Sequence, residues 1–299
     1  MKCTRCRKQT AEIELPWHNA AFCKECFQVF FRGQLQKAIR SFKMFTKKDR
    51  VLVAVSGGKD SMSLWHALLQ NGYNVTALFI HLGIPEFSDT ALEKVKGFAS
   101  KEGASLKVVY LRNEGLAIPD VIRVTRRPAC AICGRLKRYY FNRVAIEDGF
   151  DVIATGHNLD DEASRLFANL LHWKMEYLQD QSPVLPEENG LKKKVKPFFR
   201  LTEFEIAAYA FINKIDFFHR SCPLSKGATF SFYKRVLNRI EYNSPGTKMD
   251  FYQGFLKTLK PVVSKDHADA PENHCRICGY PAYGDLCSVC ALKQKMSAR

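Results

Sequence analysis

Short apolar runs alternate with amphipathic segments through the middle of the chain. Four runs rich in valine, isoleucine and leucine predict buried strands, at residues 51–55, 74–80, 106–111 and 151–156. Between them, apolar residues recur at helical spacing in the segments 60–72, 89–103 and 134–149. Strands that alternate with helices in this way build parallel sheets covered on both faces. The pattern therefore predicts an α/β fold with a doubly wound parallel sheet.

The pattern becomes mostly helical after residue 156. Helical spacing recurs in the segments 160–178, 202–214 and 229–243. Two polar stretches are expected on the surface. The three lysines at 192–194 are expected to form a solvated loop, and residues 264–273 a linker.

Cysteine pairs frame this central region at both ends of the chain. Five C-x2-C pairs and one single cysteine account for all eleven cysteines. The first and last segments each carry two pairs, and four thiolates complete a tetrahedral zinc site with no open position. We therefore expect a structural zinc ribbon at 1–32, a catalytic domain at 33–263 and a second zinc ribbon at 271–299. The expected zinc ligands are Cys3, Cys6, Cys23 and Cys26 in the first ribbon, and Cys275, Cys278, Cys287 and Cys290 in the second.

The charge of the chain favours a polyanionic partner. The formal net charge is +16, with a pI near 9.4, which is typical of proteins that bind nucleic acid. No apolar stretch approaches the roughly 20 residues that a membrane-spanning helix needs. The N-terminal residues lack the apolar core of a secretory signal. The sequence therefore predicts a cytoplasmic protein that does not enter membranes.

The strand at 51–55 runs into a loop suited to anion binding, Ser56-Gly57-Gly58-Lys59-Asp60-Ser61. In open parallel sheets, ligands bind at the carboxyl ends of the strands. Two glycines let the backbone approach a ligand, and the N–H groups at the start of the following helix bind phosphate. The loop is not a Walker A motif, because Lys59 precedes Asp60 rather than serine or threonine.

A second motif, GHNLDDEA, follows the strand at 151–156 and begins at Gly156. This glycine would let the chain approach a nucleotide. The carboxylates of Asp160 and Asp161 suit Mg²⁺ bound to phosphates. Two plainer interpretations stay open: Asp160 as the N-cap of a helix, and His157 as a hydrogen-bonded core histidine.

Three cysteines remain outside the ribbons: Cys130, Cys133 and Cys222. Three thiolates fit a zinc ion with one open position, or a [4Fe–4S] cluster with one iron free of protein ligands. A redox set with a persulfide on one cysteine is a third alternative, and inert buried thiols are a fourth. Pro128, Gly134 and basic neighbours place them at turns near the expected site rather than in a core.

The ordered set of motifs resembles one known group. SGGKDS, CxxCGxxKR, GHNxDDEA and a lone Cys-Pro, flanked by two ribbons, are similar to the two-zinc-finger tRNA 2-thiolation enzymes of the PP-loop ATP pyrophosphatase superfamily. The resemblance covers nearly the whole chain and implies an adenine nucleotide alpha hydrolase-like fold. It implies that ATP adenylates the C2 oxygen of a tRNA uridine and that sulfide then displaces AMP. The uridine favoured is 5-methyluridine 54, with wobble uridine 34 as the alternative.

The resemblance also implies roles for individual residues. Lys59, Lys137 and Asp161 would be catalytic, with Lys137 neutralising phosphate charge. Cys130, Cys133 and Cys222 would hold a [4Fe–4S] cluster whose open iron carries hydrosulfide. ATP with Mg²⁺ would be bound by Ala54, Ser56, Gly57, Gly58, Lys59, Asp60, Ser61, Ile80, Lys137 and Gly156.

The resemblance implies tRNA and a ubiquitin-like sulfur-carrier protein with a C-terminal thiocarboxylate as partners. A homodimer is among the alternatives for the oligomeric state. Two rival functions stay open. One is a different PP-loop tRNA-modifying enzyme, which would have no need of the three central cysteines. The other is a zinc-ribbon RNA-binding module with a degenerate nucleotide fold, which the intact motifs disfavour.

Overall fold

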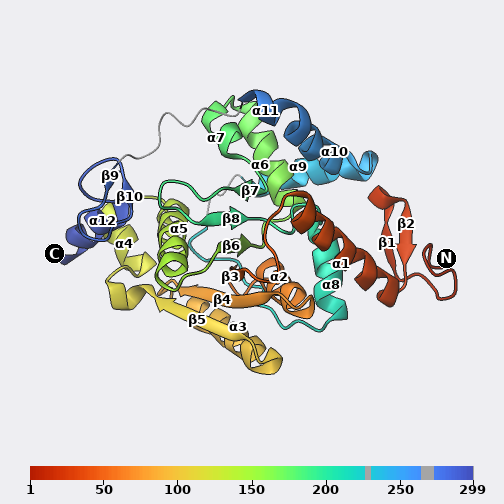
Figure 1. Cartoon of the computed structure of the whole chain (residues 1–299), viewed down its shortest axis with the longest axis horizontal. Helices are drawn as coiled ribbons and strands as arrows, with labels where there is room; N and C mark the ends of the chain where they lie inside the picture. The colour runs from red at the N-terminus through yellow and green to blue at the C-terminus, as the bar shows by residue number, and fades with distance from the viewer. Residues whose placement is uncertain (226–229, 264–272, 299) are drawn as a thin grey trace.

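A six-stranded sheet forms the centre of the molecule (Figure 1). The computed structural model describes residues 1–225, 230–263 and 273–298. Five strands are parallel, and β7 at one edge runs antiparallel to β8. The four predicted strands and the mostly parallel sheet are thus confirmed. In spatial order the strands are β5 (Ser105–Tyr110), β4 (Asn74–His81), β3 (Arg50–Val55), β6 (Val152–Thr155), β8 (Lys193–Val195) and β7 (Val184–Leu185).

Helices cover both faces of this sheet, as the pattern predicts. Side chains of a strand alternate between its faces, so Val51 and Val53 join one core cluster while Leu52 joins the other. The first cluster includes residues of α1 (Lys24–Ser41), α2 (Lys59–Gln70), α3 (Phe87–Glu102) and α8 (Glu203–Ile212). The second includes residues of α4 (Ile118–Thr125) and α5 (Ala129–Glu147), which follow the short 3-10 helix η2 (Leu111–Glu114).

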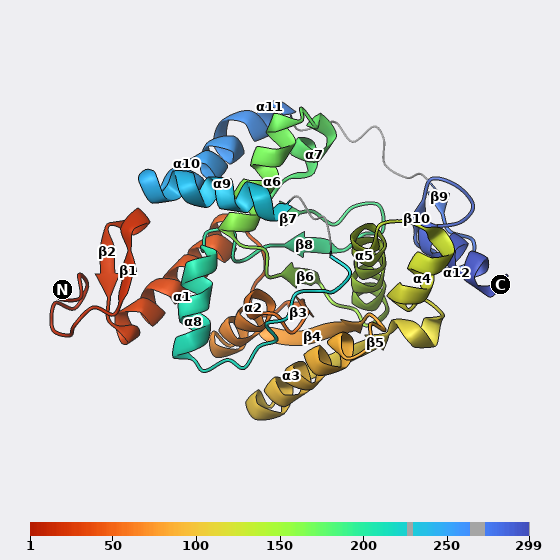
Figure 2. The ribbon, with the colours of Figure 1, turned by 180° about the vertical axis from the view of Figure 1, so that it is seen from behind.

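A separate group of helices packs together beyond the β7 edge (Figures 1 and 2). The helix expected at 160–178 is interrupted, because Trp173 takes a left-handed conformation with φ of 48° and ends its first part. The group consists of α6 (Leu159–Leu171), α7 (Met175–Asp180), α9 (Phe230–Asn243), α10 (Thr247–Gly254), the π-helix η3 (Phe255–Leu259) and α11 (Lys260–Val263).

The two cysteine-rich segments lie at opposite ends of the molecule in both views (Figures 1 and 2). The first contains β1 (Ile13–Leu15), η1 (Pro16–His18) and β2 (Ala20–Phe22), and the last contains β9 (Asn273–His274), β10 (Pro281–Ala282) and α12 (Ser288–Ser297). The boundary predicted after residue 32 falls inside α1, which begins in the first ribbon and packs on α8. The predicted linker lies outside the described residues except for Asn273.

The N-terminal ribbon is fastened to the central domain through a buried carboxylate. Glu205 of α8 is fully buried and accepts hydrogen bonds from Trp17 Nε1 at 3.3 Å and the Thr202 backbone N–H at 2.5 Å, with His18 Nε2 3.1 Å away. A buried carboxylate is costly unless such partners compensate for lost water. The ribbon and α8 are therefore expected to move as one unit.

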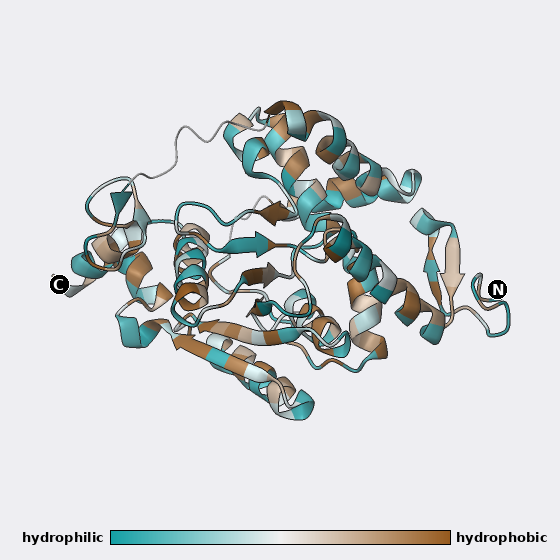
Figure 3. Cartoon of the chain, in the orientation of Figure 1, coloured by the Kyte–Doolittle hydropathy of each residue, from teal (hydrophilic) through white to brown (hydrophobic). Residues whose placement is uncertain are grey.

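The lysines at 192–194 do not form a solvated loop, so that prediction was wrong. Lys193 and Lys194 lie in β8, a hydrophilic strand between two hydrophobic ones (Figure 3). Lys194 pairs in register with Ile153, and burial, with help from Arg138 and Lys196, lowers its pKa to about 8. Three consecutive lysines gave no sign of a strand, because interior strands of parallel sheets are normally apolar.

Among the described residues, no helix is both long and apolar enough to cross a membrane.

Candidate active site

A cavity of about 570 Å³ opens where the direction of strand addition reverses. The chain passes from β3 to β4 and β5 on one side, then returns to place β6 on the other side of β3. The carboxyl ends of strands diverge at such a point, which is where α/β sheets bind ligands. Ala54 of β3, Ile80 of β4 and Thr155 of β6 all line the cavity.

The loop after β3 forms one wall of this cavity through its own hydrogen bonds. The Ser61 hydroxyl accepts from the Ser56 backbone N–H at 3.1 Å and donates to the Gly58 carbonyl at 3.0 Å. Gly57 has φ of +83°, and a Cβ there would lie 3.1 Å from the Ala91 carbonyl oxygen. Gly58 caps α2, so the first free N–H groups of that helix lie at the loop. This arrangement suits a phosphate.

Gly156 fixes the distance between the two motifs. A Cβ on this residue would lie 2.9 Å from the Ser61 backbone nitrogen and 3.0 Å from the Asp60 carbonyl carbon. Only glycine therefore allows the loop after β6 to approach the first turn of α2 this closely. The glycine serves the packing of the two loops against each other, as well as lining the cavity.

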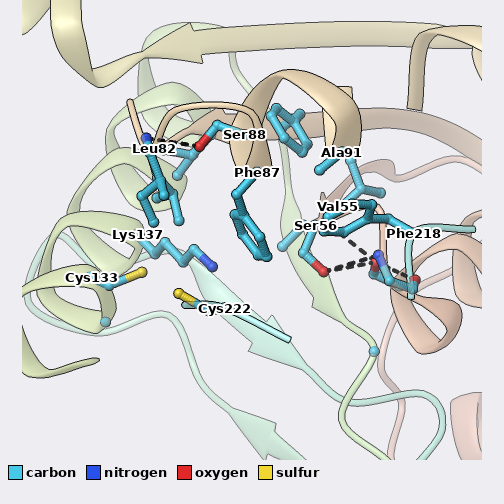
Figure 4. A pocket seen from close by; sticks show the side chains of 18 of the residues that line it. Val55, Ser56, Leu82, Phe87, Ser88, Ala91, Cys133, Lys137, Phe218 and Cys222 are labelled. Carbon is cyan, nitrogen blue, oxygen red and sulfur yellow. Dashed lines mark hydrogen bonds between the residues drawn. The ribbon is translucent and has the colours of Figure 1, made fainter. Parts of the chain in front are cut away.

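The segment after α8 crosses the cavity and carries Cys222. This segment is held to the loop of residues 56–61, named the phosphate-type loop, because the Phe218 backbone N–H donates to the Gly57 carbonyl at 2.8 Å. The Phe218 ring meets Phe87 edge to face, with centroids 5.0 Å apart. Phe87 stands in the cavity between Ser56 on one side and Cys133 and Cys222 on the other (Figure 4).

Phe87 is held there by an unusual turn. Glu86 has φ of 58° and ψ of −45°, and the Phe87 backbone N–H donates to the Pro85 carbonyl at 2.5 Å. This is a γ-turn of the rare, strained kind. Strained backbone of this type is concentrated at functional sites.

Most of the predicted site residues meet in this cavity. The predicted residues that line it are Ala54, Ser56, Gly58, Asp60, Ser61, Ile80, Lys137, Gly156, Asp161, Cys130, Cys133 and Cys222. Gly57 and Lys59 belong to the loop but do not line the cavity. The Lys59 ammonium instead pairs with Asp60 and donates to the Glu203 carbonyl at 3.3 Å.

A network of alternating positive and negative side chains borders the polar end of the cavity. Lys234 of α9 lies 2.7 Å from Asp161 Oδ1 and 3.3 Å from Glu203 Oε2. Burial pulls the pKa of Lys234 down, but the two carboxylates outweigh it and raise the pKa above its usual value. Burial also raises the pKa of Asp60, against the effect of Lys59. No pattern in the sequence indicated that Lys234 and Glu203 belong to the site.

Sequence profiles of two domains match the chain. That of the PP-loop domain matches residues 29–225, and that of the N-terminal LIM domain of 2-thiouridine synthetase TtuA matches residues 2–28. The chain is 43% identical to the tRNA-5-methyluridine(54) 2-sulfurtransferase of Thermus thermophilus, over 98% of this chain and 91% of that one. Identity to the protein of the same name from Thermotoga maritima is 42%, over 100% and 98%. The chain belongs to this TtuA-type PP-loop family.

One solved structure resembles the whole molecule. It is the U34-tRNA thiolase NcsA from Methanococcus maripaludis with its [4Fe-4S] cluster, with a TM-score of 0.81 and 25% identity. The match covers 97% of this chain and 96% of that one. The predicted fold, with ribbons at both ends of a PP-loop domain, is thereby confirmed.

Both ribbons of this PP-loop protein present compact sets of four cysteines. In each set the four sulfur atoms lie within 4.8 Å of one another, which fits a single tetrahedral ion. The sets are Cys3, Cys6, Cys23 and Cys26, and Cys275, Cys278, Cys287 and Cys290. They fit the zinc ion predicted for each ribbon.

The three central cysteines are arranged differently. Cys130 and Cys133 lie in the first turns of α5, and the sulfur atoms of Cys133 and Cys222 face each other beside the Lys137 ammonium (Figure 4). Among the described residues, the three do not form a set as compact as those of the ribbons. Burial raises the pKa of the Cys133 thiol, although Lys137 counteracts it. Three converging thiols with wider spacing fit a group larger than one ion, such as the cluster that the resemblance implies.

Asp160 is not the N-cap of α6 that the sequence offered as its plainer role. It is buried, pairs with Lys248 and accepts from the Glu203 backbone N–H at 2.7 Å. The N-cap of α6 is Asn158, whose side chain accepts from the Asp161 backbone N–H at 3.0 Å. Asp160 therefore ties α6 to α8 and α10, and it does not line the cavity.

His157 lies on the cavity wall, with Nδ1 2.9 Å from Thr155 Oγ1. Burial lowers its pKa, which favours the neutral imidazole. The hydrogen-bonded histidine considered from the sequence is therefore consistent with its surroundings, although it borders the cavity as well.

Proposed function

We propose that this chain is an ATP-dependent tRNA sulfurtransferase that converts 5-methyluridine 54 to its 2-thio form. One observation carries the proposal: a phosphate-type loop and three cysteines face each other across a single cavity. The choice of uridine is supported by identity. Relatives named for position 54 are 41–43% identical, whereas the cytoplasmic tRNA 2-thiolation proteins reach 29% and the U34 thiolase 25%.

ATP would occupy the half of the cavity next to the phosphate-type loop. Ser56, Gly58 and Ser61 would bind its phosphates through backbone N–H and hydroxyl groups. Ala54 and Ile80 offer an apolar surface for adenine at the strand ends. Asp60 and Asp161 are the carboxylates on the cavity wall, and they would hold the Mg²⁺ that accompanies ATP.

Lys59 and Lys234 would change partners when ATP binds. Both ammonium groups are now paired with carboxylates at the polar end of the cavity. MgATP brings a new partner for each member of these pairs: phosphate oxygens for the lysines and Mg²⁺ for the carboxylates. The lysines can then bind phosphate oxygens while the carboxylates bind the metal, so each buried charge keeps a partner of opposite sign.

Cys130, Cys133 and Cys222 would hold the [4Fe–4S] cluster, in keeping with their number and spacing. When bound, the cluster would supply a coordination position for sulfide close to the base. Lys137 lies between these thiols and the nucleotide side, so its ammonium can offset negative charge on both. The apolar wall around Phe87 and Phe218 would exclude water from the reacting atoms.

The chemistry balances in two steps. The C2 oxygen of the uracil attacks the α-phosphorus of ATP, the α–β phosphoanhydride bond breaks, and pyrophosphate leaves. Sulfide then forms a bond to C2, the C2–O bond breaks, and AMP carries the oxygen away. Adenylation is needed because the urea-like oxygen is otherwise a poor leaving group. Both steps need the base to be held close to phosphate and sulfur at once.

The resemblance supports two further expectations. A ubiquitin-like carrier with a C-terminal thiocarboxylate would supply the sulfur, and this is tested by adding the carrier to a turnover assay. A homodimer would give twice the 34.2 kDa mass of one chain in light scattering.

A reconstituted assay tests the proposal. Anaerobically prepared protein is incubated with MgATP, sulfide and tRNA that carries 5-methyluridine 54. We expect AMP release that depends on tRNA, with 2-thio-5-methyluridine formed in equal amount. AMP release without RNA, or sulfur found only at position 34, would contradict it. A matched tRNA with cytidine at position 54 is the control.

A further inference from the structure

We propose that an exposed aromatic patch beside the active site stacks against unpaired nucleotides of the tRNA. The patch consists of Leu171, Trp173, Met175 and Tyr177 around the α6–α7 turn, with Phe232 of α9. This inference rests on the proposed function for the identity of the RNA. It adds a binding surface outside the cavity in which ATP and sulfur would meet.

Trp173 takes a backbone conformation that disfavours a bulky residue. Its φ is 48°, in the left-handed region. The Lys174 backbone N–H donates to the Asn169 carbonyl at 2.9 Å, and that of Trp173 to the Leu170 carbonyl at 3.1 Å. This is a Schellman motif, in which glycine is the usual residue at the position of Trp173. A tryptophan there is unfavourable for folding.

Folding gains little in return from this tryptophan. The side chain is 78% exposed, so the indole contributes little to the core. Residues that are costly to the fold and expose a large ring are candidates for function. The ring is instead available to a partner.

The neighbours of Trp173 extend the same surface. Leu171, Met175 and Tyr177 are 55%, 40% and 56% exposed, so four apolar side chains project from seven consecutive exposed residues. Exposed apolar patches of this kind mark interaction sites. The His172 ring binds the Tyr233 hydroxyl at 2.8 Å, which fastens the turn to α9, where Phe232 is also 55% exposed.

The patch continues into the active site through α9. Lys234 lies two residues after Phe232 and forms an ion pair with Asp161 on the cavity wall. A chain bound across the patch would therefore reach the rim of the cavity. This is where the rest of a tRNA must lie when one of its bases enters the cavity.

The charges around the patch favour RNA over a protein partner. Lys174 lies 5.7 Å from the centroid of the Tyr177 ring, and Arg165 and Arg235 are exposed on α6 and α9, so these three cations outnumber the one exposed carboxylate of the turn at 171–177, Glu176. Protein interfaces place their aromatic residues in a core depleted of charge. Aromatic rings interleaved with cations are typical of surfaces that stack bases and bind phosphates.

Trp173→Gly separates a structural role from a binding role. Glycine suits the left-handed position, so the thermal midpoint should stay the same or rise. The affinity for tRNA should fall about 5- to 160-fold, the loss expected when one stacked base loses its ring. The slope of log affinity against log salt should not change, because the residue is uncharged, whereas Arg235→Gln should reduce it by about 1.

Three further measurements complete the test. Trp173→Phe keeps an aromatic ring and should bind tRNA nearly as well as wild type. Phe211→Ala is the matched control, because Phe211 is 80% exposed on α8, which packs against α1 and α2 instead. Affinity for MgATP should be equal in all of these proteins.

The outcomes distinguish the inference from the function on which it rests. Wild-type tRNA affinity in Trp173→Gly would overturn the patch while leaving the proposed function intact. So would normal tRNA affinity together with lost binding of a thiocarboxylate carrier protein, which would make the patch a protein-docking surface. Wild-type protein that neither binds nor thiolates tRNA would overturn the function and the patch together.

Discussion

At the scale of single residues, Asp161 has both carboxylate oxygens occupied. One accepts from the Asn158 backbone N–H at 3.2 Å, and the other lies 2.7 Å from the Lys234 ammonium. The capping contact fixes the carboxylate at the start of α6. The ion pair sets the direction in which its other oxygen points. The role assigned to Asp161 therefore depends on a lysine from a distant part of the chain.

Lys234→Met should reduce thiolation by roughly ten- to a hundredfold, since hydrogen bonds to charged groups contribute about 1.5–3 kcal/mol. Lys234→Arg should retain part of the activity. Lys94→Met is the matched control, because its ion pair with Asp216 is exposed and such pairs contribute little. Steady-state AMP release measures all three. Full activity in Lys234→Met would rule out this role.

The three central cysteines are expected to act together, because they would hold one cluster. Cys130→Ser, Cys133→Ser and Cys222→Ser should each lose iron and thiolation together, while MgATP binding stays near that of wild type. The reason is that the cysteines and the phosphate-type loop form opposite walls of the cavity. Metal analysis measures the iron content of each variant, and calorimetry measures its binding of MgATP. An iron-free variant with full turnover would favour the persulfide alternative instead.

At the scale of elements, the approach of the β6–α6 loop to α2 depends on Gly156. Gly156→Ala should destabilise the protein by about 1–3 kcal/mol, as overpacked sites do, and should weaken ATP binding. Gly97→Ala is the control, because nothing lies within 4 Å of a Cβ there and alanine favours a helix interior by about 0.5–1 kcal/mol. Denaturant unfolding of both variants checks this. Equal stability of the two would contradict the packing argument.

Lys194 in β8 should make stability depend on pH. Burial lowers its pKa from 10.5 to about 8, so between these values the unfolded chain binds more protons and stability rises with pH. Below pH 8 the charged lysine opposes folding. Lys194→Met should therefore be more stable than wild type at pH 7, and the difference should shrink from pH 8 to 10.5. A constant difference across that range would show that the lysine is not responsible.

The sequence predicted those parts of the site that are contiguous in the chain. The loop at 56–61, the paired cysteines and the GHNLDDEA segment each carry their chemistry within a few residues. Lys234 reaches Asp161 on the cavity wall only because α9 packs on α6, and Phe218 reaches the cavity only because the segment after α8 crosses the loop at Gly57. Local sequence patterns carry no information on such contacts between distant segments. Strand β8 was not predicted, because its lysines do not form the apolar run that indicates a buried strand.

At the scale of the whole molecule, the parts are arranged around one cavity. The sheet places the nucleotide loop, α5 brings two cysteines, and the segment after α8 brings the third. The ribbons lie at the two ends, and the net charge of +16 suits a partner as large and as anionic as tRNA (Figure 1).

The proposed function depends on which tRNA nucleoside receives the sulfur. Mass spectrometry of tRNA nucleosides from a strain that lacks this gene, compared with the strain complemented by wild type or by Cys222→Ser, tests it most directly. We predict that 2-thio-5-methyluridine disappears, returns with the wild-type gene and stays absent with the variant, while wobble 2-thiouridines do not change. Loss of a wobble 2-thiouridine with 2-thio-5-methyluridine intact would overturn the proposed function.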